Sequence, residues 1–305
     1  MHSNVSLPRR LSPDDRVRLV SPASTPSRDG VAQGVATLEA LGFKVELGRH
    51  VLDQHGYLAG ADEDRLADIN DALRDKGVRA VIATRGGKGA YRIANGLDFA
   101  ALRTDPKPVV GFSETTNLHL AIWKHCRVPG IHGAPWNPEQ FGQPTADSFR
   151  QALTTTDPVI VRASSHEVTV ELTTHGSAEG ILLGGNLDSI AGAAGWALPD
   201  LDGAILLIED VEKGLGHIDR HLTRLINSGY LRGIRGVAVG QFTSFKEASG
   251  WTIIDVLRDR LSRIGVPVLG GLPIGHGERP IAIPVGTVAV LDCESKTLTV
   301  STGVK

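Results

Sequence analysis

The chain has 305 residues, of which 41% are hydrophobic and 22% are charged, and its formal net charge is −2. These values are ordinary for a folded protein of two domains or one large α/β unit, and they exclude extensive disorder. The small net charge gives no reason to expect a nucleic-acid partner, and no apolar run approaches the length of a membrane span. The two cysteines lie far apart in the sequence, and the first ten residues contain no apolar signal sequence. Both observations favour a reduced, cytoplasmic setting.

Strand and helix patterns alternate through the first part of the chain. Short apolar runs predict strands at 17–20, 43–47, 78–83, 109–111 and 128–131, and apolar faces of helical period predict helices at 29–41, 62–76 and 117–126. This alternation is typical of a mostly parallel sheet with helices on both faces. Because ligands of such sheets lie beyond the carboxyl ends of the strands, we expect the loops after 78–83 and 109–111 to share one cleft.

The pattern changes where prolines at 135, 138, 144 and 158 indicate a crossing between domains. We therefore predict an N-terminal α/β domain over 1–140, an inter-domain crossing over 141–165 and a C-terminal α/β domain over 166–305. In the second half the patterns predict helices at 187–196 and 219–227, and strands at 159–163, 168–173, 180–183, 204–208, 237–239, 266–269, 287–291 and 297–300, the last two as a hairpin.

Ser113 lies in the most informative stretch, Val109-Val-Gly-Phe-Ser-Glu-Thr-Thr116, between a predicted strand and a predicted helix. A serine at such a turn is where α/β folds place a nucleophile, because the turn exposes the hydroxyl and the first amides of the helix face it. Serine is also a leading residue at helix N-caps, so a structural cap is the alternative. A full capping box is absent, because the third residue on is Thr116 and not Glu or Gln.

Two residues of the second half have the chemistry of a nucleophile's partners. Glu209 directly follows the most apolar strand there, so its carboxylate lies either at a cleft mouth or beside a neighbour such as Arg220. His276 has glycine on both sides, which leaves its imidazole accessible. Each alone is more often structural than catalytic, but with Ser113 they supply a nucleophile, a base and an orienting carboxylate.

Other motifs fit known ligand patterns less well. The loop Arg85-Gly-Gly-Lys-Gly89 has neither the spacing of a phosphate-binding loop nor that of a dinucleotide fingerprint, so it offers open backbone N–H groups or a tight turn. His217 and His221 share a helical face, but Ile218 stands where a zinc protease has glutamate, and no further ligands complete a set. We therefore predict no metal. Three other histidines are expected on helix surfaces or in packing: His119, His125 and His132.

Seven ordered blocks resemble the LD-carboxypeptidase family of serine peptidases, which also contains the microcin C immunity peptidases. They span nearly the whole chain and are Ser21-Pro-Ala23, Arg85-Gly-Gly87 with Arg92, Gly111-Phe-Ser-Glu-Thr115, His132-Gly133, Gly184-Gly-Asn-Leu187, Ile208-Glu-Asp210 with Ile218-Asp-Arg220, and Gly275-His-Gly277. The resemblance implies a flavodoxin- or amidotransferase-like N-terminal domain and a β-rich α/β C-terminal domain. It also implies a homodimer that uses neither metal nor cofactor.

The same resemblance implies a catalytic triad shared between the two domains. Ser113 would be the nucleophile, His276 the general base, and Glu209 the carboxylate that fixes the imidazole. The backbone N–H groups of Gly87 and Glu114 would form the oxyanion hole. On this basis we expect Ser113 to be a nucleophile, whether or not it also caps its helix.

Three positions depart from the family pattern near the predicted cleft. Lys88 follows the paired glycines where the family usually has Tyr, and Glu114 follows the nucleophile where Asp is usual. The usual His-Gly-Pro is here His132-Gly-Ala-Pro135, followed by Trp136. None of these changes removes a member of the triad, so they concern the substrate and not the chemistry.

The expected function is hydrolysis of an L-to-D amide bond, releasing terminal D-alanine from a small murein peptide during peptidoglycan recycling. The alternative is a microcin-immunity-type hydrolase that cleaves the amide of an aminoacyl nucleotide, with Trp136 available to stack on the base. The segment 158–180 is short for an enlarged nucleotide-binding loop, so we rank this second. A non-catalytic binding protein on the same scaffold comes third, because all three triad positions are intact.

Overall fold

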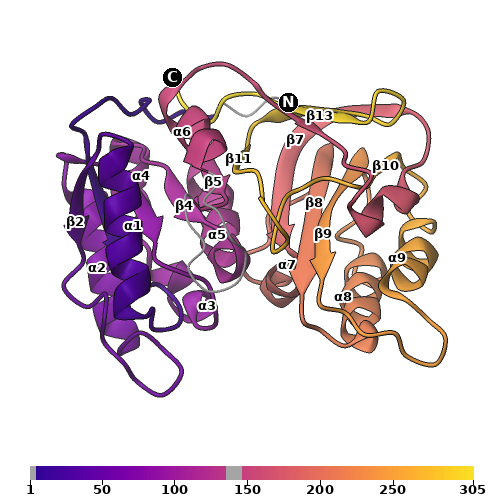
Figure 1. Ribbon diagram of the computed structural model, residues 1–305, viewed down its shortest axis with the longest axis horizontal. Helices are drawn as coiled ribbons and strands as arrows, with labels where there is room; N and C mark the ends of the chain where they lie inside the picture. The colour runs from indigo at the N-terminus through magenta and orange to yellow at the C-terminus, as the bar shows by residue number, and fades with distance from the viewer. Residues whose placement is uncertain (1–4, 135–145) are drawn as a thin grey trace.

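The computed structural model describes residues 5–134 and 146–305, which form two β-sheets with helices packed around them (Figure 1). The six strands of the first sheet lie in the order β11-β5-β4-β3-β1-β2, and the seven of the second in the order β10-β9-β8-β7-β12-β13-β6. Both sheets contain neighbouring parallel strands, so the predicted α/β class is confirmed. Within the described ranges, no helix combines the length and the apolar character needed to cross a bilayer.

The first sheet is built mainly from the N-terminal part of the chain. Its parallel strands are β1 (Arg16–Val20), β2 (Lys44–Leu47), β3 (Val78–Ala83), β4 (Val109–Gly111) and β5 (Gly130–His132). The helices around it are α1 (Arg28–Ala40), α2 (Asp62–Arg74), α3 (Ala90–Ile93), α4 (Phe99–Thr104) and α5 (Thr116–Cys126), with the 3₁₀ helices η1 (Ala94–Gly96) and η2 (Ser113–Thr115). The strands and long helices predicted for this half are confirmed, apart from small differences at their ends.

The second sheet combines a parallel part with an antiparallel part. Strands β7 (Ser177–Asn186), β8 (Ala204–Val211), β9 (Gly236–Thr243) and β10 (Val268–Leu269) are parallel. The antiparallel part consists of the predicted hairpin β12 (Val288–Asp292) and β13 (Thr297–Val300), with β6 (Val159–Arg162) beyond it. The helices of this half are α7 (Leu187–Ala193), α8 (Leu215–Asn227) and α9 (Ile253–Leu261), and α8 packs against both of the others.

One continuous hydrophobic cluster connects the two sheets. It contains Leu118 of α5 and Leu187 of α7, and these two helices pack against each other. At the edge of this contact the backbone N–H of Asn186 donates to the Thr116 hydroxyl at 3.1 Å. Because Asn186 ends β7 and Thr116 begins α5, the carboxyl ends of strands from both sheets meet at one place.

One predicted strand is wrong. Residues 168–173 form the 3₁₀ helix η3 (Val168–Leu172) instead of joining a ladder. Their β-branched side chains favour a strand, but tertiary contacts override such propensities. The Thr169 hydroxyl donates to the Gly240 carbonyl at 3.0 Å, and a Cβ on Gly270 would overlap the Thr169 carbonyl, so this segment packs against β9 and the residues after β10.

Besides the short helices α3 and α4, the sequence patterns do not predict α6 (Ala146–Thr154), α9 and β11 (Ile283–Val285). Helix α6 contributes Phe149 to the core of the first sheet. Strand β11 runs antiparallel to β5 and completes the edge of that sheet, although it lies close to the C-terminus of the chain. It has only three residues and a central proline, so no periodic pattern marks it. The domain boundaries at 140 and 166 stay a prediction.

Candidate active site

The turn after β4 holds Ser113 in a strained conformation. Its φ is +58°, in the left-handed region that residues with a side chain seldom adopt. The turn is fixed by the Thr115 N–H, which donates to the Phe112 carbonyl at 3.1 Å, and α5 follows directly. Ser113 occupies neither N-cap position, because Phe112 precedes η2 and Thr115 precedes α5. This geometry matches the strand–turn–helix expected of a nucleophile and not that of a helix cap.

Glu209 and His276 form a buried pair in the second sheet. Glu209 lies near the end of β8 and is fully buried, and its Oε2 lies 2.6 Å from Nδ1 of His276. The sequence left two places open for this carboxylate, a cleft mouth or a site beside a partner. The structure places it beside a partner, and that partner is His276. The loop can approach so closely because residue 275 is glycine: a Cβ there would lie 2.7 Å from Oε2 of Glu209.

The pKa of His276 is set by two opposing effects. Burial of the ring lowers the pKa, but the adjacent Glu209 carboxylate raises it through its charge and its hydrogen bond, and the net shift is upward. The bond from Nδ1–H to Glu209 also fixes the tautomer, so that Nε2 of the neutral ring is the acceptor. The ring is therefore arranged to take a proton at Nε2.

Ser113 and His276 line the same pocket, although they come from different sheets. The ring of Phe112, next to the serine, lies 4.8 Å from the ring of His276, centre to centre. Glu209 lies behind His276, away from the pocket surface. The structure thus brings together the three side chains that the sequence analysis singled out.

The glycine loop after β3, residues 85–89, lies against Ser113. A Cβ on Gly86 would lie 2.7 Å from Cβ of Ser113 and 3.5 Å from the backbone N of Glu114. Gly87 has φ +107° and packs against Ser24, whose hydroxyl accepts a hydrogen bond from the N–H of Lys88 at 3.0 Å. Ser24 directly follows Ser21-Pro-Ala23 in the chain, but no sequence motif marks it as a residue of the site.

Charged residues from both sheets meet at the pocket wall. Nζ of Lys88 lies 2.9 Å from Oδ2 of Asp188, and Nζ of Lys213 lies 3.0 Å from the same oxygen. The carboxylate of Asp188 also has His221 at 3.2 Å, and hydrogen bonding to His221, with the two lysines, lowers its pKa. Glu114 does not bind Lys88 directly; its Oε1 accepts from the N–H of Gly89 at 3.1 Å. Asp188 and Lys213 carry no local signal in the sequence, because the cluster around Asp188 joins separate segments of the chain.

A second carboxylate stands next to Glu209. Asp210 accepts hydrogen bonds from Nδ2 of Asn186 and from the N–H of Asp188, each at 3.1 Å. Burial, together with the charge of Glu209, raises the pKa of Asp210 to about 6. Asp210 therefore holds the first turn of α7, and with it Asp188, at the pocket.

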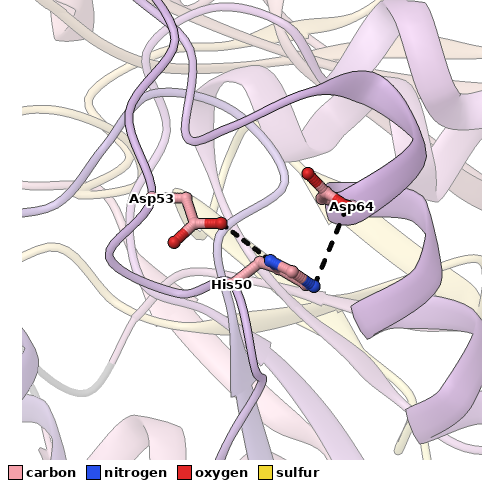
Figure 2. A group of neighbouring side chains, drawn as sticks. All are labelled: His50, Asp53 and Asp64. Atoms are coloured by element: carbon pink, nitrogen blue, oxygen red, sulfur yellow. Dashed lines mark hydrogen bonds and ion pairs between the residues drawn. The ribbon is translucent and has the colours of Figure 1, made fainter.

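Away from this pocket, His50 lies between two carboxylates (Figure 2). Its Nδ1 is 2.7 Å from Oδ2 of Asp53, and its Nε2 is 3.8 Å from Oδ1 of Asp64. The hydrogen bond to Asp53 raises the pKa of His50, so the cluster is explained as an ion pair on the loop after β2. His217 and His221 lie on α8, where His221 faces Asp188. Trp136, proposed to stack on a base, lies outside the described residues.

Comparison with known proteins assigns both halves of the chain to one family. Residues 17–133 match the LD-carboxypeptidase N-terminal domain, and residues 179–291 match the LD-carboxypeptidase C-terminal domain. The chain is 35% identical to the probable murein peptide carboxypeptidase of Bacillus subtilis, over 97% of this chain and 95% of that protein. It is 33% identical to the murein tetrapeptide carboxypeptidase of Pseudomonas aeruginosa, over 92% of this chain and 94% of that protein.

A solved structure shows the same fold at lower identity. The microcin C7 self-immunity protein MccF, in complex with aspartyl sulfamoyl adenosine, superposes with a TM-score of 0.85 and 22% identity, over 98% of this chain and 100% of that one. The agreement in fold extends over both sheets. With relatives above 30% identity that match nearly its whole length, this protein belongs to the LD-carboxypeptidase family of peptidases.

Proposed function

We propose that the protein is a serine carboxypeptidase that releases terminal D-alanine from a murein tetrapeptide by hydrolysing an L-to-D amide bond. The supporting observation is that Ser113, on a strained turn, shares a pocket with His276, which is paired with the buried Glu209. The two relatives at 35% and 33% identity are named as murein peptide carboxypeptidases. We expect the enzyme to act as a cytoplasmic homodimer, without metal or cofactor, on a small peptide.

The residues supply a complete acyl-transfer sequence. Oγ of Ser113 attacks the amide carbonyl carbon while its proton passes to Nε2 of His276. Glu209, 2.6 Å from Nδ1, stabilises the resulting imidazolium. When the C–N bond breaks, His276 gives its proton to the nitrogen of the departing D-alanine. Water then attacks the acyl carbon while His276 takes one of its protons; the bond from that carbon to Oγ breaks, His276 returns the proton to Oγ of Ser113, and the shortened peptide leaves with a new carboxylate.

The backbone N–H groups of Gly87 and Glu114 are the proposed oxyanion hole. In support, Gly86 approaches Ser113 so closely that a Cβ on it would lie 2.8 Å from Oγ of Ser113 and 3.5 Å from the backbone N of Glu114, so the glycine loop and the Glu114 amide both border the space beside the serine hydroxyl. Donors aimed at this space stabilise the negative oxygen of the tetrahedral intermediate. Removing one such donor typically lowers turnover by about 100- to 1000-fold.

The pocket wall also has groups that suit a carboxypeptidase. Such an enzyme has to hold the terminal carboxylate of its substrate, and Lys88, Lys213 and Arg85 all line the pocket. Four carboxylates line the same pocket (Glu114, Asp188, Asp210 and Glu212), so the feature that suits an anionic group is local: the ammonium groups of Lys88 and Lys213 lie together on Asp188. This charge supports a substrate with a free carboxylate beside the scissile bond.

The second candidate is a hydrolase that cleaves the amide of an aminoacyl nucleotide. It is favoured by one observation, the superposition on a microcin self-immunity protein whose structure contains aspartyl sulfamoyl adenosine. The segment 158–180, which would have to enlarge to cover a base, consists here only of β6, η3 and the start of β7. The peptide substrate therefore remains our first choice.

One assay separates these functions. Wild type and Ser113→Ala are each given a murein tetrapeptide and an aminoacyl sulfamoyl adenylate, and products are followed by mass spectrometry. We expect D-alanine to be released by the wild type only. Cleavage of the adenylate alone would move the protein to the immunity-type function with the same residues. If neither compound is cut and a serine-directed phosphonate leaves Ser113 unmodified, the catalytic assignment is wrong.

A further inference from the structure

A histidine that the proposed mechanism does not use lies behind the catalytic pair. His132 is the last residue of β5, and its side chain is 1% exposed. Its Nε2 lies 3.8 Å from Oε1 of Glu209, which is the oxygen not bound to His276. Within the described part of the chain, neither ring nitrogen of His132 nor Oε1 of Glu209 has a hydrogen-bond partner. Two buried polar groups thus face each other with their bonding capacity unused.

Leaving such groups unpaired is expensive, and more so for a charged one. The two glycines packed against Glu209 do not supply a donor for Oε1. Gly240 and Gly275 lie against its side-chain carbons and Oε2, and glycine has no side chain that could donate. Burial lowers the pKa of His132 to about 4, so its ring is neutral near pH 7 and carries one N–H. With that proton on Nε2, the ring is the donor placed to serve Oε1.

We propose that His132 is a positioning residue for the catalytic triad, donating from Nε2 to Oε1 of Glu209 and holding the carboxylate between two histidines. The separation of 3.8 Å is longer than a hydrogen bond, but catalytic hydrogen bonds are often long in unliganded sites and shorten in the substrate complex. Phe112 packs beside both histidines. Its ring centre lies 4.8 Å from that of His276 and 6.4 Å from that of His132, which it meets edge-on, and this packing fits the role proposed for His132. The inference rests on the proposed triad and adds a fourth side chain to it.

A neighbouring histidine provides the matched control. His119 is also buried, and its ring lies 6.5 Å from that of His132, but its Nε2 is 3.0 Å from the Val109 carbonyl and serves the backbone. Removing His119 therefore costs a buried polar contact in the same region without taking a donor away from Glu209. If His132 only fills space, replacing either histidine by leucine should have similar consequences.

The test compares H132L, H132Q and H119L with the wild type. The readouts are the melting temperature, the rate of D-alanine release, and the rate at which a fluorophosphonate labels Ser113 as a function of pH. Glutamine is the informative replacement, because its amide N–H₂ reaches about as far as Nε2 of histidine and can donate to the same oxygen. The labelling rate reports the triad whatever the natural substrate is.

We expect H132L to lower the labelling rate by about 10- to 100-fold, a part of the contribution of an oriented general base. The pH midpoint of labelling should also move upward, because Glu209 without its second donor acts more strongly on His276 and raises its pKa. H132Q should recover most of the rate and return the midpoint toward that of the wild type. H119L should label nearly as fast as wild type, even where its melting temperature falls as far as that of H132L.

The positioning role is refuted if H132L and H119L label at the same rate with the same pH midpoint, or if H132Q is as slow as H132L. If H132L does not fold, H132N replaces it, because asparagine keeps an amide that is too short to reach Oε1. A wild type that the phosphonate does not label would overturn the triad and this inference together. A wild type that is labelled but does not cut the tetrapeptide would overturn only the substrate.

Discussion

Replacing Gly275 by alanine should disrupt the proposed catalytic pair of Glu209 and His276 without altering any reacting atom. The residue has φ +127°, and a Cβ would lie 2.7 Å from Oε2 and 2.9 Å from Cβ of Glu209. Glu209 is fully buried, so its carboxylate has no solvent to move into. The unfavourable backbone costs about 1–3 kcal/mol and the overpacking costs about 1–3 kcal/mol. We therefore expect a loss of about 2–6 kcal/mol in the free energy of unfolding.

The effect on catalysis should be larger than a loss of stability alone would give. If Glu209 and His276 separate by about 1 Å, the rate falls by about 100-fold. Urea unfolding measures the loss of stability, and the rate of Ser113 labelling measures the effect on catalysis. Both are measured at a temperature where the variant stays folded. Gly216→Ala is the control, because its Cβ would meet no atom within 4 Å, and it should leave both quantities nearly unchanged. A Gly275→Ala protein with wild-type stability and rate would refute the geometry of the pair.

Three further predictions concern charge. Because Glu209 more than offsets the burial of His276 and raises its pKa, half-maximal kcat/KM should fall above pH ~6.5, and a midpoint below that value contradicts the pairing. Lys88→Ala should change stability by less than about 1 kcal/mol, since its side chain is half-exposed, but should raise KM; an unchanged KM would exclude Lys88 from substrate binding. The pKa of His50 is raised, so its stabilisation is full below pH ~6.5 and lost as pH rises through the folded value. His50→Gln should accordingly lower the melting temperature near pH ~5 but not near pH ~9, and equal losses at both would refute the ion pair.

Much of the fold could be predicted because local patterns carry it. Strands β1 and β3, and the amphipathic helix α2, have clear apolar periodicity, and the structure places them where the sequence does. The hairpin of β12 and β13 is local as well. The elements that were missed depend on distant contacts. Strand β11 pairs with β5, which lies far from it in the sequence, and η3 is held against β9 by the bond from Thr169 to Gly240.

The residues of the candidate site also divide into those that local sequence marks and those that depend on distant contacts. Ser113 could be found from its own surroundings, since a strand, a glycine and a helix in sequence specify the turn. Glu209 and His276 could be suspected from their neighbours, but their pairing needed the resemblance or the coordinates, because 67 positions separate them in the chain. His132 appeared as one of several histidines in packing. Only the three-dimensional structure shows that its ring faces the second oxygen of Glu209.

The division of the proposed triad between two sheets makes its alignment a property of their contact. The serine is held by β4 and α5, whereas the carboxylate and the imidazole are held by β8 and the loop after β10. Around the pocket, the bond between Asn186 and Thr116 and the ion pair between Lys88 and Asp188 join the two parts. The first is buried and the second is half-exposed, so an anionic substrate that binds Lys88 competes only with the weaker connection. Such a substrate can therefore enter the cleft while the buried contact keeps Ser113 in line with its base.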